Sequence, residues 1–333
     1  LRHLSAPPGG LLSSHRILVS GGRGFIGRRL VMALRADGIV PRVLTRDQPE
    51  ADEVQGDLTD LTDRAALDLA CSGIETVFHC AGHAHAFGAL GAEEEAQHWR
   101  VNFEGSQALA EAAGRAGVAS FVFLSSVKAV GEPGEACVDE DWPVPPDSAY
   151  GRAKRAAEAA VLAAGERYGM RVTVLRPAMV FGAGGRGNLE RMASLVRRGL
   201  FPPLPETGNR RSLVHVSDLV AAMRLVAADA RAAGRTYIVA HPVTPSGRGL
   251  YDALRRSMGM PPVGWAVPRA VLHGLARCGD LLEGLVRRRV PLDSEALARL
   301  LASACYSPAR IEAELGWRAG TGLEAGLREM LHA

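Results

Sequence analysis

The sequence predicts an α/β fold built on a parallel β-sheet, and two observations carry that prediction. Short apolar runs of strand type alternate with single helix-type segments between residues 16 and 126, and a glycine-rich turn joins the first run to the first helix. One helix between successive strands favours right-handed crossovers and a sheet covered by helices on both faces. With 333 residues and 47% hydrophobic content, the chain can bury the core of such a doubly wound Rossmann sheet.

The expected elements follow the first strand, at residues 16–19, in order. Further strands are expected at 41–45, 51–58, 76–82 and 120–126, with helices at 64–71 and 97–114. Beyond residue 176, glycine-rich and proline-rich loops precede helices near residues 250, 270 and 294. We expect a Rossmann domain (15–175 plus 213–240), a smaller, mostly helical substrate lobe (176–212 plus 241–333), and a loose N-terminal extension (1–14).

Composition and charge narrow the kinds of partner. The net charge is +3 and basic residues are spread along the chain, so neither a nucleic acid nor a membrane surface is demanded. No apolar run approaches the roughly 20 residues of a membrane span, and residues 1–14 lack a signal-peptide pattern. The five cysteines stand at irregular spacings without C-x-x-C. This predicts ordinary thiols, no disulfide framework or zinc site, and a reducing, cytoplasmic location.

The glycine-rich turn predicts a dinucleotide site. Gly21, Gly24 and Gly27 have the G-x-x-G-x-x-G spacing between a strand and a helix. The first glycine permits the tight turn, the second lets a pyrophosphate approach the backbone, and the third allows close packing of helix and strand. The phosphates would rest on the N–H groups at the start of the helix. Glycine is common in this chain, so a tight turn without a ligand is the alternative.

A second motif indicates acid/base chemistry: Tyr150 and Lys154 form Tyr-x-x-x-Lys, and Ser126 ends a predicted strand. The spacing places both side chains of the motif on one helix face, so the ammonium can lie near the phenol. A neighbouring cation and an oxidised nicotinamide ring favour the phenolate, and Ser126 would hold the same substrate oxygen. The alternative is a core tyrosine with a solvated lysine. Only Lys128 and Lys154 are lysines among 39 basic residues, which favours the catalytic interpretation.

Further motifs occur in order between about residue 16 and residue 317. They are Gly56-Asp-Leu, His79-Cys-Ala-Gly, Val101-Asn-x-x-Gly, Phe121-Val-Phe-Leu-Ser-Ser, Leu175-Arg-Pro, Arg211-Ser-Leu-Val-His-Val-Ser-Asp and Leu315-Gly-Trp. With the two motifs above, they resemble the extended short-chain dehydrogenase/reductases, in particular the nucleotide-sugar epimerase/dehydratase group that includes UDP-galactose 4-epimerase. Residues 125–132 and 187–214 are most similar to the branch found in bacterial O-antigen and capsule sugar pathways.

The resemblance implies roles for individual residues. Ser126, Tyr150 and Lys154 would be catalytic, and Lys154 would also hold the nicotinamide ribose. The implied cofactor contacts are Gly21, Gly24, Phe25, Ile26, Gly27, Arg46, Asp57, Leu58, Ala81, Gly82 and Lys154. The implied substrate contacts are His85, Lys128, Asn188, Arg211 and Arg299. A helix start at Asn188 and a guanidinium at Arg211 both favour phosphate oxygens, although Arg211 beside Arg210 is alternatively a surface cation.

The end of the second strand bears on the choice of cofactor. An NAD enzyme usually offers an acidic side chain to the ribose hydroxyls here, whereas this chain has Thr45 and Arg46, with Asp47 one step beyond. Arg46 can receive the 2′-phosphate of NADP, so NADP(H) is slightly preferred and NAD(H) stays possible. In the alternative, Arg46 points to solvent and Asp47 reaches the ribose.

Two clusters invite other interpretations. His83 and His85 follow the fourth strand, but no third ligand is evident, so loop or sugar contacts are favoured over a metal site. The three arginines at 287–289 predict a solvated face, or at most a weak membrane-surface contact. Lys128 lies two residues beyond Ser126 and either contacts the substrate or only lies above it.

The resemblance implies hydride transfer at C4 of a UDP-hexose, with Tyr150 exchanging the proton on O4. A readily exchanged NADPH would make the enzyme a 4-keto-sugar reductase in O-antigen or capsule precursor synthesis, which Arg46 favours slightly. Tightly bound NAD would make it a 4-epimerase. A 4,6-dehydratase is disfavoured because Val127 and Lys128 replace the Asp-Glu pair that it needs. A non-catalytic NADP-sensing regulator is the alternative of another class, and the family pattern implies a homodimer.

Overall fold

The computed structural model describes residues 16–60, 64–83, 92–185, 187–286 and 294–332. Its largest sheet is parallel and has seven strands in the order β10-β7-β5-β4-β1-β2-β3. The strands are β1 (Ile17–Ser20), β2 (Arg42–Thr45), β3 (Glu53–Gln55), β4 (Thr76–His79), β5 (Ser120–Leu124), β7 (Arg171–Pro177) and β10 (Thr236–Val239). The α/β prediction is confirmed. The strand order runs in opposite directions from β1, so the carboxyl ends of β1 and β4 form the crevice where such sheets bind ligands.

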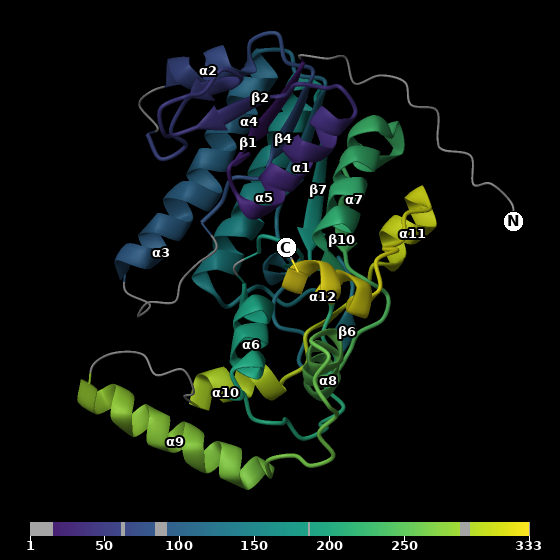
Figure 1. Ribbon diagram of the computed structural model, residues 1–333. Helices are drawn as coiled ribbons and strands as arrows, with labels where there is room; N and C mark the ends of the chain where they lie inside the picture. The colour runs from purple at the N-terminus through teal and green to yellow at the C-terminus, as the bar shows by residue number, and fades with distance from the viewer. Residues whose placement is uncertain (1–15, 61–63, 84–91, 186, 287–293, 333) are drawn as a thin grey trace, which may run out of the picture.

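Helices cover both faces of this sheet (Figure 1). One face carries α1 (Phe25–Ala36), α7 (Val216–Ala228) and α11 (Ala309–Leu315), and the other carries α2 (Arg64–Cys71), α4 (Gly105–Arg115) and α5 (Ala149–Tyr168). On the first face, Leu30 and Leu34 lie one turn apart on α1 and are fully buried with Met223 of α7. On the second face, Leu109 and Val161 are fully buried in a separate core cluster. Apolar residues at helical spacing therefore attach each layer to the sheet.

The helix expected at 97–114 is interrupted. The structure has α3 (Ala92–His98), a π-helical segment at Trp99–Glu104, and then α4. Asn102, within the π-helical segment, is fully buried, and its amide nitrogen donates to the carbonyl oxygen of His83 at 2.9 Å. Single π-helical turns occur mostly inside longer helices and frequently at functional sites. Through Asn102, this π-helical segment binds His83 in the segment that follows β4.

Beyond β7, the helices that do not cover the main sheet form a region below it in Figure 1. Its helices are α6 (Asn188–Arg197), α8 (Gly247–Ser257), α9 (Arg269–Val286), α10 (Ser294–Leu301) and α12 (Leu323–His332). Within residues 213–240, which we expect to return to the main sheet, β10 joins the sheet and α7 packs against one face of it. Strand β9 (Leu213–His215) pairs instead with β8 (Met179–Phe181) in a small parallel sheet. The division into two lobes stays a prediction.

The prediction of five ordinary thiols is wrong for two of them. Strands β6 (Cys137–Val138) and β11 (Cys305–Tyr306) pair in parallel with Cys137 opposite Cys305. The two Cα atoms are 4.5 Å apart and the sulfur atoms form a disulfide. The partners are separated by 168 residues in the sequence, so their spacing could not reveal the pairing. The inference of a reducing compartment from cysteine spacing therefore loses its basis.

A buried ion pair joins α5 to the sheet. Arg176 on β7 donates to Glu158 on α5 from Nε at 2.9 Å and from Nη2 at 2.7 Å, and the two side chains are 5% and 4% exposed. Ser125, just after β5, donates to the same carboxylate at 2.5 Å. The third guanidinium nitrogen donates to the carbonyl oxygen of Glu140 at 3.0 Å. The network therefore satisfies the charges that packing has removed from water.

We expect Glu158→Ala to lower the free energy of unfolding by about 3–5 kcal/mol, because it leaves the Arg176 guanidinium buried without a counter-ion. Asp68→Ala is the control, because Asp68 forms an exposed pair with Arg115, and such pairs contribute about 0–1 kcal/mol. Urea unfolding at neutral pH measures both changes. Equal, small losses in the two variants would show that the buried pair is dispensable.

Candidate active site

The glycine turn has the geometry of a dinucleotide cradle. Gly21 has φ +70°, and a Cβ atom there would lie 2.6 Å from the backbone nitrogen of Ala81. A Cβ atom at Gly27 would lie 2.2 Å from the carbonyl oxygen of Gly21. The N-cap of α1 is Gly24, which has no side chain that could accept from the N–H groups at the helix start. The first N–H groups of α1, at Phe25 and Ile26, therefore have no capping side chain and suit a pyrophosphate.

The other predicted cofactor residues lie along the same sheet edge. Ala81 and Gly82 follow β4, and a Cβ atom at Gly82 would lie 3.2 Å from Nζ of Lys154. Asp57 accepts hydrogen bonds from the backbone nitrogen and the hydroxyl of Thr59, each at 2.8 Å. Leu58 is buried. The structure therefore places Gly82 and Lys154 together, while Asp57 holds its own loop.

The three predicted catalytic residues come from two adjacent elements. Ser126 caps a short 3-10 helix, Val127–Ala129, and its hydroxyl accepts from the backbone nitrogen of Lys128 at 3.2 Å. Tyr150 lies in the first turn of α5, whose N-cap Ser148 accepts from the backbone nitrogen of Gly151 at 3.1 Å. Burial raises the pKa of Tyr150 to about 12, and a hydrogen bond from Ser126 acts in the opposite direction. Ser126 and Tyr150 are therefore in contact.

Lys154 is buried rather than solvated. Its side chain is one turn beyond Tyr150, and the residue is 3% exposed. Nζ donates to the carbonyl oxygen of Leu124 at 3.0 Å and lies 4.8 Å from the centre of the Phe123 ring. Burial lowers the pKa of Lys154 to about 8, while the charge of Glu158 opposes this shift. Burial, rather than the charge of Lys154, is thus the larger influence on Tyr150 in this structure.

Two residues given no role in the sequence analysis lie beside the predicted catalytic residues, His98 at Tyr150 and Asn102 near Gly82 and Lys154. The His98 ring lies edge-on to the Tyr150 ring, with 5.6 Å between centroids. Asn102 holds the backbone of His83 from both sides, accepting from its nitrogen at 2.8 Å and donating to its oxygen at 2.9 Å. Asn102 belongs to the Val-Asn-x-x-Gly motif and is one of three asparagines. These two features were the sequence signals that could have identified it as a site residue. His98 carried none.

The predicted substrate residues are only partly brought together. Lys128 forms an ion pair with Glu132. Burial lowers the pKa of Arg211, and the charge of Glu132 opposes this shift. Asn188 is the first residue of α6 and is exposed. Arg299 lies on α10, but its side chain, His85 and residues 287–289 lie outside the described residues. Lys128 and Arg211 thus share one acidic neighbour, which the sequence analysis did not single out.

At the end of β2, the guanidinium of Arg23 lies against Asp47, next to Arg46. Arg46 is exposed, whereas the Asp47 carboxylate is bound by Nη1 of Arg23 at 3.1 Å. Arg23, from the glycine turn, also binds Glu53 at 2.6 Å. The carboxylate that would compete for the ribose is therefore engaged by a guanidinium.

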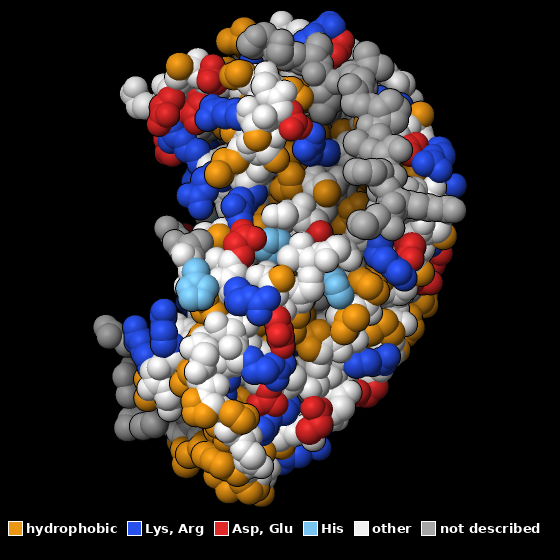
Figure 2. All heavy atoms as spheres, turned by 45° about the vertical axis from the view of Figure 1, so that its right-hand side comes forward, with side chains coloured by type: hydrophobic (Ala, Val, Ile, Leu, Met, Phe, Trp, Pro, Cys, Tyr) orange, Lys and Arg blue, Asp and Glu red, His pale blue; other side chains and the backbone are white. Residues whose placement is uncertain are grey.

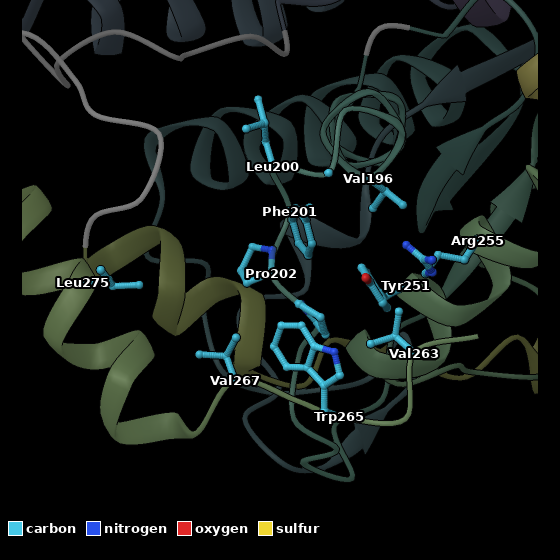
Figure 3. A pocket seen from close by; sticks show the side chains of 12 residues that line it. Val196, Leu200, Phe201, Pro202, Tyr251, Arg255, Val263, Trp265, Val267 and Leu275 are labelled. Atoms are coloured by element: carbon cyan, nitrogen blue, oxygen red, sulfur yellow. The ribbon is translucent and has the colours of Figure 1, made fainter. Parts of the chain in front are cut away.

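Surface shape gives two further features. Figure 2 shows a hollow at the left edge of the molecule, between its upper and lower parts, with basic side chains on both rims. A cavity of about 500 Å³ lies elsewhere, and Phe201, Pro202, Tyr251 and Trp265 are among its lining residues (Figure 3). None of the predicted site residues lines this cavity, so we place the candidate active site at Ser126, Tyr150 and Lys154 instead.

Comparisons with known proteins agree with this geometry. Residues 17–240 match the NAD dependent epimerase/dehydratase family. The UDP-glucose 4-epimerase of Vibrio cholerae is 28% identical over 325 residues, covering 95% of this chain and 94% of that protein. The ceramide reductase of Caulobacter vibrioides is 36% identical over 219 residues, covering 63% of this chain and 60% of that protein.

Solved structures show the same fold. MoeE5 in complex with UDP-glucose and NAD has a TM-score of 0.73 and 26% identity, over 95% of this chain and 97% of that chain. The Thermus thermophilus UDP-glucose 4-epimerase in complex with NAD has a TM-score of 0.70 and 25% identity, over 95% and 98%. Among the described residues, no helix is long and apolar enough to cross a membrane. With a match over residues 17–240 and the fold in common, this chain belongs to the NAD dependent epimerase/dehydratase family.

Proposed function

We propose that this protein is an NAD(P)-dependent enzyme that acts by hydride transfer at C4 of a UDP-hexose. The observation that carries the proposal is the contact of Ser126 with Tyr150, one helical turn from buried Lys154, whose ammonium lies at Gly82. Among the similar proteins are a UDP-glucose 4-epimerase and MoeE5 in complex with UDP-glucose and NAD, which supports a nucleotide-sugar substrate. A non-catalytic regulator on the same fold is disfavoured because all three residues are present.

Each residue of this group has a separate task. Tyr150 exchanges a proton with O4 of the sugar, and Ser126, which contacts Tyr150, holds the same oxygen in line. Lys154 presents its ammonium at Gly82, where it can hold the nicotinamide ribose. The bound dinucleotide supplies the hydride acceptor and donor. Burial keeps the phenol protonated until charge develops nearby, which suits the donation of a proton to a forming alcohol.

The same arrangement supports either of two net reactions. We favour a 4-keto-sugar reductase with a slight preference for NADP(H), in O-antigen or capsule precursor synthesis. Exposed Arg46 can meet a 2′-phosphate, and Arg23 already engages the Asp47 carboxylate. A 4-epimerase with tightly bound NAD is the second candidate, supported by the NAD complexes among the similar structures. Asn188 and Arg211 would hold the diphosphate, and we propose a homodimer formed through α4 and α5.

Cofactor identity separates the two reactions. We expect purified protein to release little dinucleotide on denaturation and to bind NADPH more tightly than NADH. Arg46→Ala should weaken NADPH binding by about 10- to 150-fold, by loss of one charge-assisted contact of about 1.5–3 kcal/mol, and leave NADH binding unchanged. Fluorescence titration measures both affinities. Release of stoichiometric NAD would reject the NADP preference and make the 4-epimerase the leading candidate.

Replacement of the phenol tests the acid/base assignment. We expect Tyr150→Phe to lower kcat by about 10²–10⁴, the usual contribution of general acid–base catalysis, with dinucleotide affinity unchanged. Tyr168→Phe is the matched control, because Tyr168 ends the same helix and its hydroxyl donates to Glu111 on the surface. Steady-state kinetics with UDP-sugars provide the measurement. Full activity in Tyr150→Phe would remove Tyr150 from the mechanism.

The burial of Lys154 predicts a pH-dependent stability. Its pKa of about 8 in the folded protein lies below the ordinary value of 10.5, so the cost of burying the charge is fully present below pH 8. Between these values the unfolded chain binds more protons, so stability rises with pH. The difference corresponds to about 3 kcal/mol.

We therefore expect Lys154→Met to be stabilised relative to the wild type most strongly near pH 7, with the advantage shrinking toward about pH 10. Urea unfolding of both proteins across this range isolates the contribution of Lys154 from other titrating groups. A stability difference that stays constant with pH would mean that Lys154 keeps its ordinary pKa.

A further inference from the structure

Three potential metal ligands converge beside Tyr150. They are His83, after β4, and Glu94 and His98, both on α3, and their ligand atoms lie within 4.8 Å of one another. Glu94 and His98 are four residues apart and therefore share one helix face. The sequence analysis considered His83 with His85 and found no third ligand. The structure brings Glu94 and His98 of α3 to His83. The sequence did not reveal that α3 lies beside the segment after β4.

The surrounding hydrogen bonds hold the His98 imidazole and the backbone of His83. Nδ1 of His98 lies 3.1 Å from the carbonyl oxygen of His83. Nδ2 of Asn102 also lies 3.3 Å from this nitrogen. In the tautomer that donates to the closer carbonyl oxygen, Nδ1 carries the proton and Nε2 keeps its lone pair. Metal-binding histidines are held in the same way, by donating from the second ring nitrogen to a carbonyl or carboxylate. The imidazole centroids of His83 and His98 are 4.9 Å apart.

Asn102 provides rigid support for the cluster. It is fully buried, and its two hydrogen bonds fix the backbone of His83 at both its nitrogen and its carbonyl oxygen. His98 is 2% exposed, whereas His83 and Glu94 are partly exposed. A cation can therefore reach the cluster from solvent while one ligand is held by the protein interior. The two flexible torsions nearest the Glu94 carboxylate allow it to close on an ion.

We propose that His83, Glu94 and His98 form a Zn²⁺ site, with a fourth coordination position open to the active-site cleft. Two imidazoles and one carboxylate are typical ligands of zinc sites that keep an open position, with Zn–N distances of about 2.0–2.1 Å. Ligand atoms in such a site lie about 3.3 Å apart, so the present group, within 4.8 Å, would draw together by at most about 1.5 Å on binding an ion. His98 contacts the Tyr150 ring, so an ion there lies beside the proposed catalytic phenol.

The test measures binding and needs no enzymatic activity, so it is independent of the proposed function. The full chain is stripped with a chelator and titrated with Co²⁺, whose visible absorption reports tetrahedral coordination, and then with Zn²⁺ as competitor. We expect one ion per chain. Glu94→Gln should weaken binding at least about tenfold, comparable to or larger than losses from outer-shell changes, without disturbing the helix.

The chain offers matched controls on the same helix. Glu93→Gln and Glu95→Gln remove one carboxylate each, at exposed positions that the cluster does not use, and should bind Co²⁺ like the wild type. His98→Asn should also lose the ion, and its thermal unfolding curve shows whether it is folded. Equal affinities of the wild type and Glu94→Gln would overturn the proposal, as would loss of binding only when the exposed Cys278 is replaced by serine.

Discussion

The active-site geometry depends on one buried carboxylate. Glu158 lies on α5, one turn beyond Lys154, and binds Arg176 on β7 and Ser125 after β5. Ser125 immediately precedes Ser126 in the sequence. The same carboxylate therefore sets the position of α5, which carries Tyr150 and Lys154, relative to the strand end that carries Ser126. Since a buried charge without a partner costs several kcal/mol, alternative positions of α5 are strongly disfavoured.

Burial shifts the pKa values of the two proposed catalytic groups on α5 in opposite directions. It favours the neutral forms of both Tyr150 and Lys154, raising one pKa and lowering the other. Glu158 partly restores the ammonium form of Lys154, and Ser126 partly favours the phenolate. Each proposed catalytic group is thus adjusted by a different neighbour, so a substitution at one neighbour should affect one group more than the other.

Charge pairs control the edges of the site. Arg23 of the glycine turn engages Asp47, while Arg46 is exposed beside it at the end of β2. At the substrate end, Glu132 lies near both Lys128 and Arg211, so two cations share one acidic neighbour. A diphosphate that binds Arg211 would compete with Glu132 for that cation. The proposed cofactor and substrate contacts can therefore be altered at these ion pairs without changing the proposed catalytic residues.

Local rules were sufficient for the parts of this protein that the sequence predicted. The glycine turn, the strand and helix alternation, and the Tyr-x-x-x-Lys spacing each depend on dihedral freedom or on the period of one element, so Gly21 and Lys154 could be assigned without long-range contacts. Pairings between distant segments could not be assigned. Cys137 meets Cys305 across 168 residues, β9 joins β8, and Glu94 reaches His83. These contacts follow from strand register and the docking of whole helices, which depend on the packed core and not on the spacing of residues along the chain.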